Sequence, residues 1–372
     1  MWFEDYAVNR ICLISADSTS MLRPANDSAP AGGEAIQKLL LARAFVDLGY
    51  DVSMIVRAIH DDIDETIEGI RVLSAFKYGA GVPLIRFFHP RASGFLRALS
   101  KVNADIYYQS PAGALTGLTA AFCRFKRRKF IFRVASDADC VPDRNFIELW
   151  RDRKLYEYGL RGANLIAAQS IYQQELLMRN YGLESTVVNM AMELPEEDLD
   201  GSRDIDVLWI SNLKPVKRPD RLLQIAKRLV DIEFTMIGGQ LPGYEEYFAE
   251  MEREASMLPN VKFLGHVPYK EVNQYVSRSK ILLNTSDVEG FPNTFLQAWA
   301  RKVPVVSFFD PDEIIVREGF GLRPDTDDEM CSALRELFDD SQKRERIGAA
   351  ARAFAVKHYA PVVAARQYLE SL

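Results

Sequence analysis

The stretch KILLNTSDVEGFPNTFLQAWARKVPVVSF, residues 280–308, contains two short apolar runs separated by a longer amphipathic segment. The runs 280–286 and 303–308 have the length and the aliphatic content of buried strands. The segment 293–302 predicts a helix that begins directly after Pro292. A strand, a helix and a second strand in this order form the crossover that joins parallel strands of one sheet. The stretch therefore predicts a doubly wound α/β fold.

The same alternation of apolar runs and helical patterns covers nearly the whole chain. The strand-like runs of the first half are 11–17, 51–56, 105–110, 129–135, 164–170 and 186–191, and those of the second half include 206–212, 233–239 and 261–266. Parallel sheets covered by helices on both faces have this pattern. An acidic stretch with Pro and Gly separates the halves, so we predict a first domain 1–195, a linker 196–204 and a second domain 205–360, followed by a last helix 361–372.

Composition excludes several classes of function. The 372 residues carry a formal net charge of −6, which argues against a general nucleic-acid binder. The four cysteines are far apart, so neither a zinc site nor a disulfide framework is expected. The first ten residues carry acids where a secretion signal would be basic and then apolar. We therefore expect a cytoplasmic protein.

The loop 287–292 lies at the carboxyl end of a predicted strand, where open α/β sheets bind ligands. The backbone N–H groups at the start of the next helix, from Asn293 to Phe295, attract phosphate. Phosphate would repel the carboxylate of Glu289, which is therefore suited to sugar hydroxyls. The loop predicts a sugar-nucleotide site made by Glu289 together with Gly290, Phe291, Pro292, Asn293 and Thr294. The alternative is that Glu289 is an ordinary solvated acid beside a helix cap.

Two further loops are candidates for the same ligand. Lys214, Lys217 and Arg218 follow the strand that ends at Asn212, and cations at this position can face a diphosphate. A solvated basic loop is the alternative. Glycines that allow close approach of the backbone to a ligand occur at Gly32, Gly33 and Gly239, although the glycine fingerprint of a dinucleotide-binding dehydrogenase is absent.

Several of these motifs, in their order along the chain, resemble the GT-B glycosyltransferases of family 4. They are GG-E with LARAFVDLGYDV, NLKPVKRPD with LLQIA, FTMIGG, VKFLGHV and EGFPNTFLQAWA with KVPVV. The resemblance implies two Rossmann-like domains facing a central cleft, with a sugar nucleotide as donor. It also implies retention of anomeric configuration, no metal or cofactor, and a last helix that packs back on the first domain.

The resemblance also suggests roles for single residues. Members of the family carry a Glu-x7-Glu motif, whose first acid touches the donor sugar and corresponds to Glu289. The second acid corresponds to Gln297, which can hydrogen-bond a ribose hydroxyl but carries no charge. The usual Arg corresponds to Asn212 and the usual Lys to Lys217. Asp137 lies where the family often has a His near the acceptor, so we assign it to the acceptor side.

We therefore predict a retaining, metal-independent glycosyltransferase of the hexosyltransferase type. It would move a sugar from a nucleoside diphosphate to a hydroxyl of a glycan or glycolipid, in cell-envelope polysaccharide synthesis. Glu289, Lys217 and Asp137 are its expected catalytic residues. Because Gln297 and Asn212 depart from the family pattern, a glycosyltransferase-like binding subunit without turnover is the alternative.

The segment 71–135 has an unusual charge. It holds twelve basic residues and one acid, Asp105, and therefore carries +11 in a chain of net charge −6, with phenylalanines interleaved. Such a surface fits peripheral contact with an anionic membrane that carries a lipid-linked acceptor. A solvated face, or a cleft wall that attracts phosphorylated donors, is the alternative.

Overall fold

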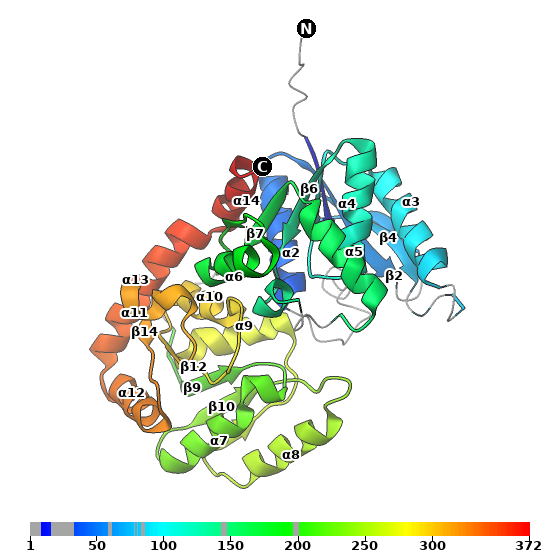
Figure 1. The fold of residues 1–372 in the computed structure, drawn as a ribbon. Coiled ribbons are helices and arrows are strands. Elements are labelled where there is room, and N and C mark those ends of the chain that lie inside the picture. The colour runs from blue at the N-terminus through cyan, green and yellow to red at the C-terminus, as the bar shows by residue number, and fades with distance from the viewer. Residues whose placement is uncertain are drawn as a thin grey trace. The chain divides into compact units, whose positions relative to one another are not determined.

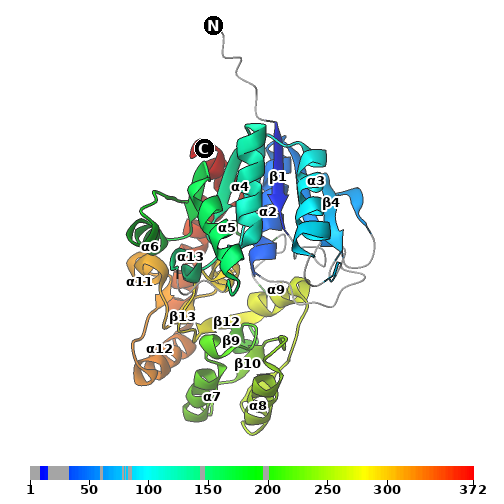
Figure 2. The same cartoon turned by 45° about the vertical axis from the view of Figure 1, so that its right-hand side comes forward.

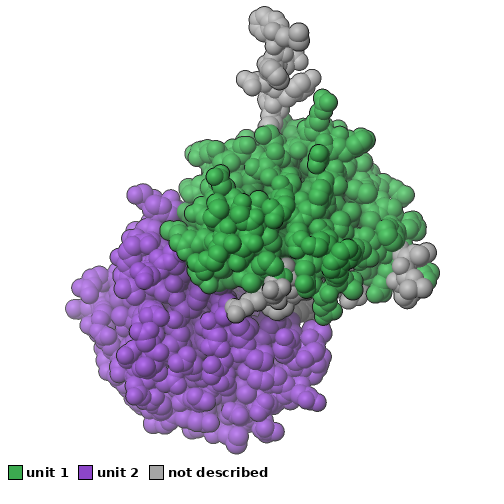
Figure 3. All heavy atoms as spheres, in the orientation of Figure 1, with its two compact units in different colours: residues 1–191, 361–372 green, residues 192–360 purple. Residues whose placement is uncertain are grey.

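A computed structural model describes residues 9–15, 33–58, 62–77, 79, 81–82, 86–142, 147–195 and 201–372. The chain divides into two compact units, residues 1–191 with 361–372 and residues 192–360, which Figure 3 colours separately. Each unit is built on its own sheet with helices packed against it (Figure 1). The predicted Gly32 and positions 196–200 of the predicted linker lie outside the described residues.

The sheet of the first unit has eight strands in the order β3-β4-β2-β1-β5-β6-β7-β8. All its neighbouring pairs are parallel except β3 with β4. The order runs one way from β1 to β2 and the other way from β1 to β5, so the strand order reverses between β1 and β5. The strands are β1 Arg10–Ile14, β2 Asp51–Ala58, β3 Asp64–Ile67, β4 Ile70–Lys77, β5 Ile106–Gln109, β6 Lys129–Arg133, β7 Leu165–Ala168 and β8 Thr186–Val187.

Helices cover both faces of this sheet (Figures 1 and 2). They are α2 Gly33–Asp47, α3 Ser93–Val102, α4 Ala114–Lys126, α5 Trp150–Arg161, α6 Ile171–Tyr181 and α14 Pro361–Glu370, with the short turns η1 Phe87–Ala92 and η2 Asp137–Cys140. Successive side chains of a strand point to opposite faces. Accordingly, Ile11 and Leu13 of β1 pack with Phe45 of α2 and Tyr368 of α14, whereas Cys12 packs into the cluster formed with α3 to α6.

Helix α14 belongs to the first unit although it follows the second unit in the sequence. The hydroxyl of Tyr368 accepts a hydrogen bond from the buried Arg133. The backbone N–H of Asn189 donates to Gln367 Oε1 at 3.0 Å. These two contacts, together with the apolar packing, fix α14 against the sheet of the first unit.

The second unit has six parallel strands in the order β11-β10-β9-β12-β13-β14. They are β9 Ile205–Ile210, β10 Phe234–Ile237, β11 Val261–Phe263, β12 Ser279–Asn284, β13 Val305–Ser307 and β14 Gly321–Leu322. The helices are α7 Pro219–Arg228, α8 Glu245–Ser256, α9 Tyr269–Arg278, α10 Asn293–Ala300, α11 Ile314–Glu318, α12 Asp327–Asp339 and α13 Ser341–Tyr359, with the turns η3 Pro215–Lys217 and η4 Pro311–Glu313. Numbered within the unit, this order is 3-2-1-4-5-6, the doubly wound order of dinucleotide-binding sheets. The strand order reverses between β9 and β12.

Candidate donor site in the second unit

The loops that follow β9 and β12 lie side by side, because these two strands pair at the point where the strand order reverses. The backbone N–H of Asp287 donates to the carbonyl of Val216 at 3.0 Å, which joins the two loops directly. Thr285 adds a side-chain link, since its hydroxyl accepts from Trp209 Nε1 and lies 2.9 Å from the carbonyl oxygen of Lys217. Doubly wound sheets bind their ligands at this position.

Lys217 and Glu289 form an ion pair across the two loops. The Nζ of Lys217 lies 2.6 Å from Glu289 Oε2, and the side chains are 22% and 14% exposed. The other oxygen, Oε1, accepts from the Ser286 hydroxyl at 2.7 Å. The sequence predicted Lys217 at a diphosphate and Glu289 at a sugar, but it did not predict that the two would contact each other. An ammonium group has three N–H donors, so Lys217 can hold Glu289 and still bind a phosphate oxygen.

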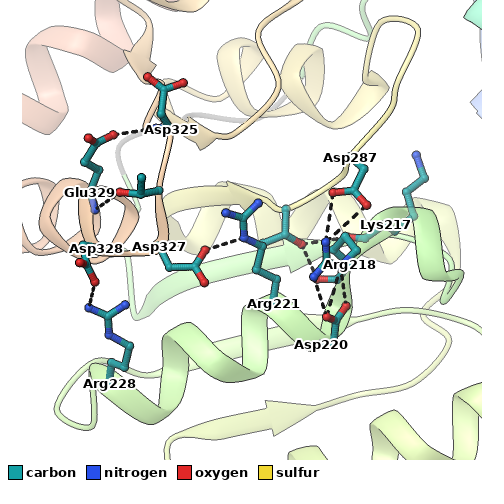
Figure 4. Close-up of polar contacts among 12 residues, drawn as sticks. Lys217, Arg218, Asp220, Arg221, Arg228, Asp287, Asp325, Asp327, Asp328 and Glu329 are labelled. Carbon is teal, nitrogen blue, oxygen red and sulfur yellow. Dashed lines mark hydrogen bonds and ion pairs between the residues drawn. The ribbon is translucent and has the colours of Figure 1, made fainter.

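The other two cations of this loop, Arg218 and Lys214, differ in whether a carboxylate neutralises them. Arg218 begins α7 in the left-handed region at φ 52° and bonds to Asp220 and Asp287 (Figure 4). Its hydrogen bond to Asp220 raises the pKa of the guanidinium above its ordinary value. By contrast, Lys214 has no carboxylate partner in the described part of the chain. Lys214 is therefore better suited than Arg218 to add positive charge to a ligand.

Helix α7 is anchored to α12 by two ion pairs, which Figure 4 shows together with the Arg218 cluster. Arg221 Nε lies 2.5 Å from Asp327, and Arg228 Nη2 lies 2.5 Å from Asp328. The guanidinium of Arg221 also stacks over the ring of Phe308, 3.4 Å from its centroid. Arg221 thereby fixes the start of α7, next to the basic loop, and Arg228 fixes the other end of the helix.

The start of α10 is fixed by apolar packing and has no side-chain cap. Pro292 is the N-cap residue and makes no capping hydrogen bond. The ring of Phe291 packs against Trp299 and Tyr359, with centroids 6.1 and 5.5 Å away. Phe291 and Pro292 are both buried, so their side chains anchor the loop. Contact with a substrate is left to backbone atoms and to the partly exposed Asn293 and Thr294.

Gln297 takes part in a hydrogen-bonded network inside the unit. Its amide donates to Asn273 Oδ1 at 3.0 Å, and Asn273 Nδ2 donates to Glu193 Oε2 at 2.8 Å. Glu193 also accepts from the hydroxyl of Tyr269 at 2.8 Å. The side chain of Gln297 is therefore already engaged, and an amide supplies the donor that Asn273 Oδ1 needs. Sequence reasoning did not identify Asn273 or Glu193, because polar residues on a helix and in a loop carry no motif.

We expect Gln297→Glu to lower the free energy of unfolding by about 0.5–1.5 kcal/mol, because a carboxylate cannot donate to the partly buried Asn273 and this hydrogen bond is lost. Urea denaturation measures this change. Gln224→Glu, the same replacement at an exposed position of α7, is the control and should be nearly neutral. A large change in donor affinity with unaltered stability would instead favour direct contact of position 297 with the donor.

Gly239 lies where the ends of β9, β10 and β11 converge. A Cβ atom at this position would lie 3.3 Å from His266 Nδ1 and 3.7 Å from Asn212 Oδ1. The structure therefore brings Asn212, Gly239 and His266 together, beside the loop of the basic residues. A side chain at position 239 would therefore be in close steric contact with the imidazole of His266.

The predicted residues of the first unit lie at the carboxyl edge of its sheet. Gly33 is exposed and begins α2, and the buried Lys38 of that helix donates to the carbonyl of Ser110 at 2.6 Å. Asp137 is partly exposed in η2 and accepts from Gln173 Nε2 at 2.9 Å. No sequence pattern singles out Lys38, since its spacing is that of an ordinary helix residue.

Asp139, two residues after Asp137, has a structural role. Its carboxylate accepts from the backbone N–H groups of Ala135 at 2.8 Å and Ser136 at 3.3 Å, and so fixes the turn that follows β6. Burial raises the pKa of this carboxyl group from 3.8 to about 6. The folded chain therefore binds the proton more tightly than the unfolded chain.

It follows that the contribution of Asp139 to stability is fully present below pH 3.8 and is lost as the pH rises through about 6. We expect Asp139→Asn, which keeps an oxygen acceptor without titrating, to flatten this decline. Urea denaturation at a series of pH values measures the slope. The matched control is Asp62→Asn at an exposed position, and equal slopes in both variants would contradict the assignment.

Among the residues that the structure describes, no cluster of three or more His, Cys, Asp or Glu side chains is arranged to hold a metal ion. None of the helices in the described ranges combines the length and the apolar character needed to span a membrane.

Residues 193–354 match the family model of the glycosyl transferases group 1. A GDP-mannose-dependent monoacylated alpha-(1-6)-phosphatidylinositol monomannoside mannosyltransferase of Corynebacterium glutamicum is 27% identical over 157 residues, which are 38% of this chain and 40% of that protein. The sulfoquinovosyl transferase of Arabidopsis thaliana is 22% identical over 335 residues, 80% of this chain and 62% of that protein. The matches thus span less than two thirds of either relative.

The fold is similar to that of solved glycosyltransferase structures. Sucrose-phosphate synthase from Thermosynechococcus elongatus superposes with a TM-score of 0.74 at 18% identity, over 97% of this chain and 98% of that chain. At this identity the likeness establishes the fold alone. The α/β class and the GT-B fold predicted from the sequence are confirmed.

Proposed function

Because residues 193–354 match the family model of the glycosyl transferases group 1, we propose that the protein moves a sugar from a nucleoside diphosphate to a hydroxyl group. The acceptor is a glycan or a glycolipid of the cell envelope, and the transfer retains the anomeric configuration without a metal or a cofactor. One observation supports this proposal above the others. Lys217 follows β9, Glu289 and the start of α10 follow the neighbouring strand β12, and the two side chains form an ion pair.

The diphosphate binds at the start of α10, because the positive end of the helix dipole attracts phosphate. Lys217 and the unpaired Lys214 add positive charge there, as far as the described residues show. These fixed charges stabilise the negative charge that develops on the departing phosphate. Glu289, oriented by Ser286, accepts hydrogen bonds from sugar hydroxyls. Asn212 and Gly239 lie at the same edge of the sheet and, with Gln297 of α10, are assigned to the nucleoside side.

In the reaction, the bond from the anomeric carbon to the phosphate oxygen breaks, and a bond to the acceptor oxygen forms on the same face. The acceptor proton passes to the leaving phosphate, so no separate base is needed. Asp137 of the first unit, with Gly32 and Gly33, is assigned to the acceptor side. The mannosyltransferase relative is GDP-mannose-dependent by name and acts on a phosphatidylinositol mannoside, which supports this donor class and a glycolipid acceptor.

A thermal-shift screen of UDP-, GDP- and ADP-sugars tests the donor site. A ligand that binds only the folded chain at a hundred times its Kd adds about 2.7 kcal/mol to apparent stability, and this raises Tm. We expect one nucleoside series to raise Tm and the other two to raise it less. If no nucleoside diphosphate raised Tm at millimolar concentration, the donor site would be disproved.

The alternative of a non-catalytic binding subunit is motivated by Gln297, whose amide is engaged by Asn273. Incubation with the donor found in the screen separates the two functions. An enzyme releases the nucleoside diphosphate by slow hydrolysis or by transfer to an added acceptor lipid. Donor binding with neither release nor transfer would favour the subunit.

A further inference from the structure

A hollow of about 450 Å³ opens at the C-terminal ends of α4 and α5 in the first unit. These two helices lie side by side in both views (Figures 1 and 2). The hollow is at the edge of the sheet where β6 begins, and therefore at the opposite end of the strands from the ligand-binding carboxyl edge. Its walls carry the cations Arg124, Arg127, Arg128, Lys129 and Arg161, together with Tyr158.

Most of these cations have no carboxylate partner. Arg128 pairs with Asp105 at 2.9 Å, and Asp105 also accepts from Arg10. The other four, Arg124, Arg127, Lys129 and Arg161, make no ion pair with any residue that the structure describes. Cations near helix C-termini balance the helix dipole, which accounts in part for Arg124 and Arg161. Arg127 is the C-cap residue of α4 and is accounted for in the same way, whereas Lys129 is the first residue of β6 and is not.

Three other cations of the basic segment 71–135 are placed differently. Arg71 and Lys101 both contact Asp64, and these contacts lower the pKa of Asp64 to about 2. Arg133 is buried inside the unit beneath Tyr368. The excess positive charge read from the sequence is therefore not one uniform face. The unpaired cations around the hollow lie at the ends of α4 and α5. Elsewhere in the same segment, Lys77, Arg86, Arg91 and Arg97 also make no ion pair with a residue that the structure describes.

Exposed aromatic side chains accompany this charge. Phe125 is 80% exposed between two basic neighbours, and the Nζ of Lys126 lies 5.3 Å from the centre of its ring. Tyr158 is 43% exposed on the wall of the hollow. Lys154, one turn before Tyr158, adds no free charge, because its Nζ pairs with Glu157 at 2.7 Å. A soluble phosphate would need the cations alone, whereas an anionic bilayer also accommodates an exposed Phe and a Tyr at its interface.

We propose that this surface binds an anionic phospholipid membrane, with a lipid phosphate in the hollow and Phe125 inserted among the head groups. Membrane contact at this site does not depend on the proposed transfer activity. It would hold the chain at the bilayer by electrostatic attraction and a small apolar contact. The charge complementarity of four unpaired cations and the exposure of Phe125 together favour a bilayer over a soluble anion.

Co-sedimentation of the full chain with vesicles tests the proposal. Vesicles of phosphatidylcholine mixed with phosphatidylglycerol should bind the chain, and vesicles of phosphatidylcholine alone should bind it weakly. Binding should fall as salt is added, because exposed charges are screened within about 10 Å at 0.1 M ionic strength. Equal binding to both vesicles, or binding to neither, would overturn the proposal.

The triple variant Arg124→Ser, Arg127→Ser and Lys129→Ser should bind anionic vesicles about 10²-fold more weakly, since each basic residue near such a surface contributes about 1 kcal/mol. The control variant Lys227→Ser, Arg253→Ser and Lys262→Ser removes the same charge from exposed positions of the second unit and should bind as the wild type does. Phe125→Ser should weaken binding while leaving its salt dependence unchanged. If both triple variants lost the same vesicle affinity, the binding would depend only on the net charge of the chain, and the proposal would be overturned.

Two further measurements are needed. The first distinguishes a lipid phosphate from a soluble anion, and the second distinguishes a loss of membrane binding from a loss of folding. Inorganic phosphate or glycerol phosphate, added at the ionic strength of a chloride control, should compete only weakly with vesicles. Strong competition would identify a soluble-anion site and contradict the membrane proposal. The thermal shift caused by the sugar nucleotide should be unchanged in the triple variant, which shows that the chain is folded and that the donor site is independent.

Discussion

Glu289→Gln should leave nucleoside-diphosphate affinity at the wild-type level or slightly above it, and should reduce sugar transfer by about 10²-fold or more. A carboxylate beside a phosphate site repels the diphosphate, but it stabilises positive charge that develops on the sugar ring in the transition state. The amide has the same shape, and its oxygen can face Lys217 while its NH2 group faces the Ser286 hydroxyl. The local fold should therefore tolerate the change, and the loss should fall on kcat.

Calorimetry with the nucleoside diphosphate and steady-state kinetics with the full donor measure the two effects separately. Asp287→Asn is a matched control, since it also removes a carboxylate from the same loop. Asp287 is 48% exposed and faces Arg218. Its loss should therefore change transfer only a few-fold. If Glu289→Gln kept full transfer activity, Glu289 would be a loop acid without a catalytic role, although the fold and the diphosphate site would remain.

That the two site loops lie at the same edge of the sheet could be predicted from the sequence. The runs 206–212 and 280–286 predict parallel strands, and all parallel strands of one sheet end at the same edge. That β9 and β12 are direct neighbours is a further fact, since many strand orders are compatible with the same alternation. The hairpin of β3 and β4 was missed, since it interrupts the alternation of strand and helix with an antiparallel strand.

Side-chain partners at the site could not be predicted in the same way. Whether Lys217 or Arg218 reaches Glu289 depends on a single left-handed residue at the start of α7, which turns Arg218 toward Asp220 and Asp287. Similarly, the partner of Gln297 lies 24 positions earlier on another helix, and no pattern in the sequence links the two. Local propensity specifies the elements, whereas these contacts depend on the packing of elements that are distant in the sequence.

Lys217→Ala should weaken nucleoside-diphosphate binding by about tenfold to 10²-fold, since losing a charge-assisted contact costs about 1.5–3 kcal/mol. Two causes contribute to this loss in the structure. One is the lost contact between the ammonium group and the phosphate. The other is that Glu289, only 14% exposed, loses its cation and then repels the incoming diphosphate. The single variant cannot separate these causes, but a double-mutant cycle can.

In the cycle, Lys217→Ala is combined with Glu289→Gln, and diphosphate affinity is measured by calorimetry for all four proteins. If Lys217 only neutralises Glu289, removing the acid as well should restore affinity to the level of the Glu289→Gln variant. If Lys217 touches the phosphate, the double variant should remain at least about tenfold weaker than Glu289→Gln, because no other group supplies the lost contact. We expect the second result, since a lysine has donors for both partners and lies at the sheet edge where α10 begins. Lys227→Ala, at an exposed position near the other end of α7, should leave affinity unchanged and so excludes a general effect of charge.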